Sequence, residues 1–257
     1  MKDRHMISNK EEKYEIVSEI PNDVLDGRLL FVKRTSANGV HKIGNPHPAK
    51  FIPEIARWAI KKYSEKGENV LDPFVGSGTT MIEARLLERN ALGIEHNPLA
   101  RLISKVKSTY ISKETMISAK KRIEKLIELE QHKSKKPPEF RNRDFWFDYA
   151  ASESIAIINS CIQQFEKDVK DFFLVVLSEV IQNVSKVGSG QILPAARKKR
   201  QTHEKITKNE VIRRFLLRLD NNIMRLSSFC ERIDKDRFSK IIGNDACEMD
   251  TNYDIDL

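Results

Sequence analysis

One stretch decides the fold of this chain: Val70-Leu71-Asp72-Pro73-Phe74-Val75-Gly76-Ser77-Gly78-Thr79-Thr80. An apolar strand over 70–72 runs into a glycine-rich turn, and the pattern predicts a helix over about 79–88. A second short apolar strand over 91–95 follows and ends in an acid, Glu95. This order of strand, turn, helix and strand predicts an α/β unit that can cradle a nucleotide-like ligand.

The glycine turn is suited to an anion. Gly76 and Gly78 allow a positive φ and let a ligand approach the backbone closely. The helix that follows presents free N–H groups and the positive end of its dipole, and Thr79 and Thr80 add hydroxyl donors there. Glu95 comes about 20 residues further on, at the tip of the next strand, where a carboxylate can accept both hydroxyls of a ribose.

Three ligands compete for such a turn. A P-loop for ATP needs a lysine after its last glycine, and Thr79-Thr80 supplies none. A dinucleotide fingerprint needs a third glycine, but the residue three positions after Gly78 is Met81. The methionine carboxylate of S-adenosylmethionine is a single anion that a short turn can hold. The sequence therefore favours S-adenosylmethionine, and a glycine turn without a ligand is the alternative.

The motifs resemble those of the amino-directed DNA methyltransferases, which modify adenine N6 or cytosine N4. The stretch 72–80 is similar to their first cofactor motif, and Gly93-Ile94-Glu95-His96-Asn97-Pro98 is similar to their second. Upstream, His47-Pro48-Ala49-Lys50-Phe51-Ile52-Pro53 resembles the motif that starts the fold when the cofactor half comes first. Downstream, Gly243-Asn244-Asp245-Ala246 is similar to a Gly-Asp-Ala segment, with an additional Asn after the Gly.

The resemblance implies a Rossmann-like, S-adenosylmethionine-dependent α/β fold, with an incomplete sheet and a helical insert. It also implies roles for individual residues. The turn surrounds the methionine moiety, Phe74 lies against the adenine, Glu95 meets the ribose, and the acid of the downstream segment meets the adenine amino group. The expected cofactor-binding residues are Phe51, Asp72, Pro73, Phe74, Gly76, Ser77, Gly78, Thr79, Glu95, Asn97 and Asp245.

The catalytic motif of the family is absent from residues 1–257. The family uses Ser/Asp/Asn-Pro-Pro-Tyr/Phe, whereas here Pro137-Pro138 is followed by Glu139. An exocyclic amine is a poor nucleophile, and the family flips its base out of the duplex and presents two hydrogen-bond acceptors beside an aromatic ring. The motif is expected after a strand such as Ile255-Asp256-Leu257. We therefore expect this chain to be an N-terminal portion of such an enzyme, without catalytic residues and inactive alone. A second polypeptide is expected to supply the missing catalytic half.

Composition is consistent with a DNA partner. The net charge of +8 and the pI near 9.3 favour a polyanion such as double-stranded DNA. Arg197-Lys198-Lys199-Arg200 is the best phosphate-contact candidate, and a solvated loop is the equal alternative. Three cysteines without ligand spacing indicate a reducing cytoplasm and no metal site. No apolar run approaches the ~20 residues that a membrane span needs. A restriction-modification or phage-defence role follows from the resemblance.

The chain divides into four expected segments: a lead segment over 1–40 with one strand and a loop, a cofactor-binding core over 41–112, a helical insert over 113–235, and a return to the sheet over 236–257. A helix is expected over about 53–63, and another from 99 to 107. In the insert, Ser112 or Thr115 can cap one helix and Ser152 another. A strand over 238–242 is expected to rejoin the sheet.

Two other functions remain open. Guanosine-N2 methyltransferases of RNA share the pattern Asp-Pro-x-x-Gly-Ser-Gly-Thr, although the block from His47 to Phe51 argues against them. A non-catalytic remnant or subunit that binds DNA or a protein is the second alternative, and the missing Pro-Pro-aromatic motif supports it.

Overall fold

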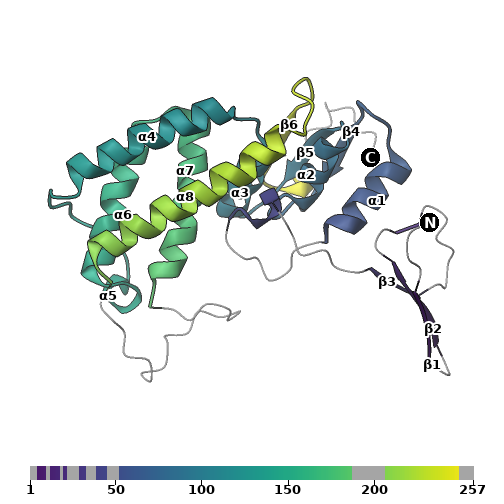
Figure 1. Ribbon diagram of the computed structural model, residues 1–257, viewed down its shortest axis with the longest axis horizontal. Helices are drawn as coiled ribbons and strands as arrows, with labels where there is room; N and C mark the ends of the chain where they lie inside the picture. Colours follow the sequence, from purple (N-terminus) through teal and green to yellow (C-terminus); the bar gives the residue numbers. More distant parts are fainter. Residues whose placement is uncertain are drawn as a thin grey trace. The chain divides into compact units, whose positions relative to one another are not determined.

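The computed structural model describes strands at 5–9, 12–17 and 29–32, short pieces at 20–21 and 39–44, and the long stretches 52–186 and 206–248. The chain forms two compact units. The first comprises Met1–Lys42, Ala49–Thr109 and Glu231–Leu257, and the second comprises Ile43–Pro48 and Tyr110–Cys230. Figure 1 labels their elements.

The lead segment contains a small sheet of its own. Strand β1 (His5–Asn9) pairs antiparallel with β2 (Glu12–Val17), and β2 pairs parallel with β3 (Leu29–Val32). The expectation of one strand and a loop was therefore wrong. The alternation of polar and apolar residues over 13–16 is the period-two signal that predicts a strand here.

The sheet that follows is parallel and has the order β4-β5-β6. Its strands are β4 (Asn69–Asp72), β5 (Asn90–Ile94) and β6 (Ser239–Gly243). In the register, Asp72 lies opposite Gly93, and Ile94 lies opposite Gly243. The three carboxyl ends therefore meet at one edge. The expected α/β Rossmann-like arrangement is confirmed, and the strand expected over 238–242 returns beside β5.

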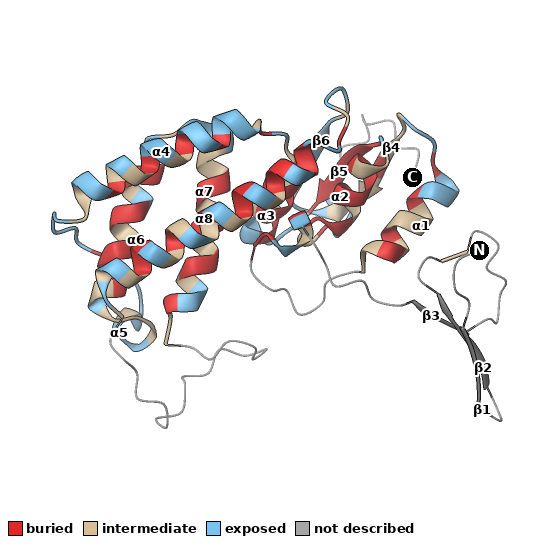
Figure 2. Cartoon of the chain, in the orientation of Figure 1, coloured by how far each residue is buried: buried red, intermediate tan, exposed pale blue. Residues whose placement is uncertain are grey.

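Three helices cover this sheet. They are α1 (Pro53–Tyr63), α2 (Thr79–Leu86) and α3 (Pro98–Ser108), which are close to their expected ranges. α2 packs against both β4 and β5, α1 packs against α2, and α3 packs against α2 and β6. Every residue of β5 is buried, as Figure 2 shows. The core here consists of Ile60, Val70, Val75, Met81, Ala84 and Ala91.

Local sequence explains where these helices begin. Pro53 and Pro98 each occupy a first-turn position, where proline's fixed φ suits a helix and its missing N–H costs nothing. Asn97 caps α3, because its side-chain oxygen accepts hydrogen bonds from the N–H groups of Leu99 at 2.9 Å and Ala100 at 3.2 Å.

The second unit is helical in its described part. It contains α4 (Lys113–Glu130), α5 (Arg143–Trp146), α6 (Tyr149–Ile162), α7 (Lys167–Val184) and α8 (Lys208–Cys230). α7 and α6 pack against each other and against α8, and α4 packs against α6 and α8 (Figure 1). Among the helices that the structure describes, none combines the length and apolarity needed to cross a bilayer.

Ser112 and Ser152 had been expected to cap helices, and only Ser112 does. Its hydroxyl accepts a hydrogen bond from Thr115 N at 3.1 Å at the start of α4. Ser152 lies inside α6, where its N–H donates to the carbonyl of Asp148 at 3.0 Å. The helix begins earlier than expected, at Tyr149, and Asp148 occupies its N-cap position.

One buried carboxylate joins three parts of the second unit. Glu179 on α7 accepts hydrogen bonds at Oε1 from Asn222 Nδ2 on α8, at 2.8 Å, and from Gly44 N, at 2.7 Å. The side chain is almost fully buried, so each of these bonds satisfies a group that water cannot reach. Ile43 and Gly44 therefore belong with the helices, although they precede α1 in sequence.

A second carboxylate, Glu153 on α6, ties α8 to the loop after α4. Its Oε2 lies 2.7 Å from Lys208 Nζ, and its Oε1 accepts hydrogen bonds from Ser134 Oγ at 3.2 Å and Lys135 N at 3.3 Å. The hydrogen bond from Lys208, with the backbone bond from Lys135, holds the pKa of this carboxyl below its ordinary value. The ionised form is therefore more stable in the folded chain than in the unfolded chain.

This lowered pKa predicts a pH-dependent stability. The contribution of Glu153 is fully present above the unfolded pKa of about 4.3, and it is lost as the pH falls through the folded pKa. We expect Glu153→Gln to lower the free energy of unfolding most near neutral pH, with a deficit that shrinks below about pH 4. Urea denaturation across pH measures it, with Glu128→Gln on the exposed face of α4 as the control. A deficit that stays constant with pH would contradict the assignment.

Candidate cofactor site

Three acids follow the three strands of the β4-β5-β6 sheet. Asp72 ends β4, Glu95 comes directly after β5, and Asp245 comes two residues after the end of β6. The N–H of Glu95 donates to the carbonyl of Gly243 at 3.3 Å, which keeps the β5 and β6 ends together. The carboxyl edge of a parallel sheet is where α/β folds bind ligands. The strands therefore bring these acids to the edge where a ligand is expected.

The turn between β4 and α2 depends on its glycines. Gly76 has φ +52° and Gly78 has φ +88°, a region that side chains with a Cβ rarely adopt. A Cβ on Gly78 would also lie 2.9 Å from the Cα and Cβ of Ser104 on α3. Gly78 therefore meets two constraints at once, a left-handed backbone and close packing against a helix.

The Asp72 carboxylate stabilises the turn through two hydrogen bonds. Its Oδ1 accepts a hydrogen bond from Phe74 N at 2.9 Å, and its Oδ2 accepts one from the Thr80 hydroxyl at 2.6 Å. The first bond fixes the backbone directly after β4, and the second fixes the start of α2. Because each carboxylate oxygen has two acceptor positions, Asp72 keeps acceptor capacity for a ligand.

Glu95 holds the turn from the neighbouring strand. Its Oε2 accepts a hydrogen bond from Gly76 N at 2.9 Å, and its Oε1 accepts one from Asn97 N at 2.8 Å. The side chain is half-buried, so the carboxylate is oriented and still reachable. Each oxygen retains one acceptor position, which is what two neighbouring ribose hydroxyls require.

The amino end of α2 has N–H groups without an intrahelical acceptor. Its first intrahelical hydrogen bond runs from Ile82 N to Gly78 O at 3.1 Å, so the N–H groups of Thr79, Thr80 and Met81 have no intrahelical acceptor. Gly78 is the N-cap and provides no side-chain cap. These amides and the helix dipole therefore favour a negative group beside the turn.

The other expected residues lie in different settings. Phe74 is 81% exposed, and Pro73 beside it is also exposed. Asn97 is exposed, but its side-chain oxygen already caps α3. Asp245 is exposed, and its Oδ1 accepts a hydrogen bond from Cys247 N at 2.9 Å. Their contact with a cofactor stays a prediction. Phe51 and Arg197-Lys198-Lys199-Arg200 lie outside the described residues.

Sequence reasoning missed a buried ionic cluster on α2. Glu83 is fully buried, with His41 Nε2 2.9 Å from its Oε1 and Arg57 Nε 2.8 Å from its Oε2. Arg57 comes from α1, and His41 comes from the short 3-10 helix Gly39–Lys42, η1. A single charged residue in a helix gives no sequence signal of burial. The cluster joins three elements behind the turn.

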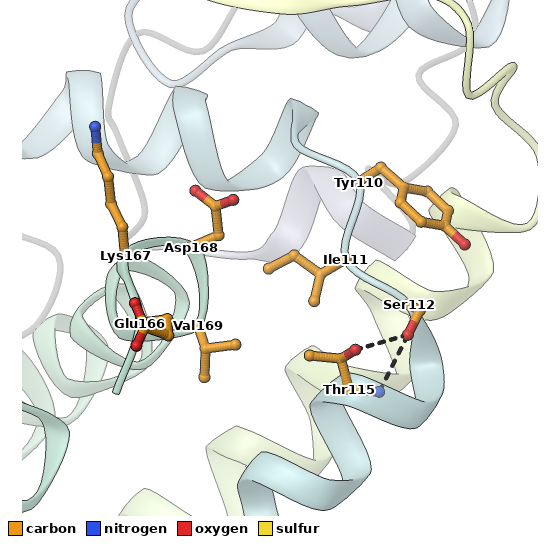
Figure 3. A pocket seen from close by; sticks show the side chains of 8 residues that line it. All are labelled: Tyr110, Ile111, Ser112, Thr115, Glu166, Lys167, Asp168 and Val169. Atoms are coloured by element: carbon orange, nitrogen blue, oxygen red, sulfur yellow. Dashed lines mark hydrogen bonds between the residues drawn. The ribbon is translucent and has the colours of Figure 1, made fainter. Parts of the chain in front are cut away.

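The helical unit has a hollow of about 530 Å³ at the amino ends of α4 and α7 (Figure 3). Its lining residues are Tyr110, Ile111, Ser112, Thr115, Glu166, Lys167, Asp168 and Val169. The carboxylates of Glu166 and Asp168 oppose the attraction of these helix ends for anions. Within the described ranges, no group of three or more His, Cys, Asp or Glu side chains could hold a metal ion.

The fold and the site together define an α/β domain whose parallel strands bring a glycine turn and three acids to one edge. Residues 2–106 match the family model described as "DNA methylase". The type II methyltransferase M.MvaI of Kocuria varians is 28% identical over 195 residues, which cover 72% of this chain and 41% of that protein. These matches are similarities to DNA methyltransferases, in agreement with the resemblance that the motifs indicated.

Two further type II methyltransferases match shorter parts of the chain. M.MjaII of Methanocaldococcus jannaschii is 35% identical over 78 residues, or 30% of this chain and 14% of that protein. M.BglI of Bacillus subtilis is 42% identical over 69 residues, which cover 26% of this chain and 20% of that protein. This chain thus spans less than half the length of the curated relatives that it matches. No solved structure matches it.

The packing of Gly78 gives a direct test of the turn. We expect Gly78→Ala to lower the free energy of unfolding by about 2–5 kcal/mol, because left-handed strain and overpacking against Ser104 add. Gly39→Ala is the matched control, since Gly39 has φ +60° but nothing lies within 4 Å of an added Cβ. Its cost should be about 1–2 kcal/mol. Equal losses of unfolding free energy in the two variants, measured by urea denaturation, would contradict the close approach of Gly78 to Ser104.

Proposed function

We propose that the β4-β5-β6 edge binds S-adenosylmethionine and that the protein transfers its methyl group to an exocyclic amine of DNA, adenine N6 or cytosine N4. One observation carries this proposal. The uncapped amino end of α2 lies beside Asp72 and Glu95, two oriented carboxylates on adjacent strands. An anion site next to acceptors for hydroxyl and amino groups matches a ligand that carries a carboxylate, an ammonium and a ribose.

The residues present fit this cofactor group by group. The amides at the start of α2 would hold the methionine carboxylate, and Asp72 would meet the amino group. Glu95 would accept the ribose hydroxyls through its remaining acceptor positions. Phe74 would cover the adenine, which gives its exposed ring an apolar partner, and Asp245 would meet the adenine amino group. When bound, the cofactor supplies an electrophilic methyl group on a sulfonium.

Double-stranded DNA is the proposed substrate. The relatives named above are type II methyltransferases, and a net charge of +8 favours a polyanion. We assign Arg197-Lys198-Lys199-Arg200 to phosphate contact on charge alone. The setting that fits is a restriction-modification or phage-defence system in the cytoplasm. The buried thiol of Cys161, which forms no disulfide, suits a reducing compartment.

Methyl transfer needs acceptors for the target amine beside an aromatic ring. Residues 1–257 contain no Pro-Pro-aromatic sequence. We therefore propose that this group comes from outside these residues, as on a second polypeptide. With a tritiated methyl donor, residues 1–257 alone should transfer no label to unmethylated duplex DNA. Transfer to DNA would refute this requirement, and transfer to RNA would favour the guanosine-N2 alternative.

Replacement of Phe74 tests cofactor binding at the sheet edge. Calorimetric titration should show that S-adenosylmethionine binds the wild type, and that Phe74→Ala raises its Kd by roughly tenfold, since a stacked base contributes about 1–3 kcal/mol. Phe238→Ala is the matched control, because Phe238 is also exposed but precedes β6, at the opposite end of that strand. Equal losses in the two variants would refute the assignment of Phe74.

A further inference from the structure

The short helix α5 and the residues beside it carry aromatic side chains to the surface of the helical unit. Phe145 is 53% exposed, and Phe140 before it and Tyr149 after it are 48% and 56% exposed. Tyr149 is the first residue of α6. Exposed apolar groups that gather in one place are typical of an interaction site. The position of these rings therefore requires an explanation.

The backbone that carries Phe145 is fixed by several hydrogen bonds. The carbonyl of Asn142 accepts from the N–H groups of Phe145 at 3.0 Å and Trp146 at 3.2 Å. Lys186, shortly after α7, donates from its N–H to Trp146 O at 2.8 Å and from its Nζ to Asp144 O at 3.0 Å. The Trp146 ring packs nearly perpendicular to the Phe145 ring, with centroids 4.7 Å apart. Phe145 is thus presented from an ordered turn, which reduces the entropy that binding must offset.

The ends of three helices meet beside this turn. Asp148, directly before α6, has its Oδ1 2.9 Å from Lys186 Nζ. Glu153 in α6 has its Oε2 2.7 Å from Nζ of Lys208, the first residue of α8, and its Oε1 accepts from Lys135 N after α4. The start of α6, the end of α7, the start of α8 and the loop after α4 therefore lie together with α5 (Figure 1). We call this region the α5 end.

Basic side chains outnumber acidic ones among the described residues of the α5 end. Residues 135–153, 183–186 and 208–214 contain eight Lys or Arg and five Asp or Glu. Each of the five carboxylates has a basic nitrogen within 2.9 Å. Arg141, which follows Phe140 in the sequence, is exposed. The surplus of positive charge favours a polyanion.

Exposed rings interleaved with basic side chains suit a strand of nucleic acid. Its bases stack on aromatic rings, and its phosphates attract Lys and Arg. In a duplex each base already stacks on its neighbours, so an exposed ring can reach only an unpaired base. An apolar protein surface would use the rings but not the surplus of positive charge. The strand is therefore the better match.

We propose that the α5 end binds a nucleic-acid strand with unpaired bases. The bases stack on Phe145 and Tyr149, and Arg141 contacts phosphate. This surface belongs to the helical unit, and its ligand is not the cofactor of the β4-β5-β6 edge. The inference therefore goes beyond the proposed function and does not rest on it.

The first test separates stacking from charge. A labelled strand of about 12 thymidylates carries bases, whereas an abasic strand of the same length carries the same phosphates alone. Fluorescence anisotropy with residues 1–257, without cofactor, should show tighter binding of thymidylate. We expect Phe145→Ala or Tyr149→Ala to raise the Kd of thymidylate by roughly tenfold, through the loss of one stacked base, and that of the abasic strand less than about twofold. Phe145→Leu, which lacks a ring, should behave like Phe145→Ala. Phe238→Ala removes an exposed ring of the other unit and is the matched control.

The second test addresses the phosphate contact. Arg141→Gln should weaken the binding of both strands and reduce the slope of log Kd against log salt concentration by about 0.7. Lys66→Gln is the control, because the Lys66 side chain is also exposed but lies in the other unit. Equal effects of these two variants overturn the role of Arg141.

Loss of the preference for thymidylate in Phe145→Ala or Tyr149→Ala, with retention in Phe238→Ala, supports the proposal. Equal binding of the two strands by the wild type, equal losses in Phe145→Ala and Phe238→Ala, or retention of the preference in Phe145→Leu overturns it. A matched uridylate strand identifies the source: tighter thymidylate binding indicates DNA, tighter uridylate binding indicates RNA, and either supports the proposal. Titration with S-adenosylmethionine is a separate measurement, so a failure of cofactor binding and a failure of strand binding are distinguishable.

Discussion

The candidate site depends on the contact between Gly78 and Ser104. At this point the chain leaves β4 in a left-handed turn and starts a helix against α3, with no space for a Cβ. The contact sets the distance between α2 and α3. Asp72 and Glu95 then hold the turn through its backbone and the Thr80 hydroxyl. The turn is therefore built before any ligand binds, which reduces the entropy that binding must offset.

Charged groups behind the turn support it. Glu83 connects α2 to α1 and η1 through Arg57 and His41, and Lys107 connects η1 to the turn itself. Because His41 and Arg57 share the Glu83 carboxylate, replacing Glu83 would remove both contacts at once. Charged side chains of α1, α2 and α3, together with His41 of η1, thus stabilise the elements around the glycine turn.

Local signals predicted the elements of the β4-β5-β6 sheet and its glycine turn, but they missed two strands of the lead segment and the start of α6. Pro53 and Pro98 marked helix starts, the glycines marked the turn, and apolar runs marked β4 and β5. The sequence could not reveal which charged residues are buried. Glu83 and Lys107 look like ordinary surface residues of helices, because burial depends on partners far along the chain. The same holds for Glu179, which binds the backbone of Gly44.

The central claim is that the amides at the start of α2 bind the carboxylate of S-adenosylmethionine. Amide hydrogen exchange, resolved by residue with and without this ligand, tests it most directly. Exchange at Thr79, Thr80 and Met81 should slow on binding, while the amides at the start of α7 should not change. Unchanged exchange at those three residues in the presence of bound ligand, or equal slowing by ATP, would contradict the account.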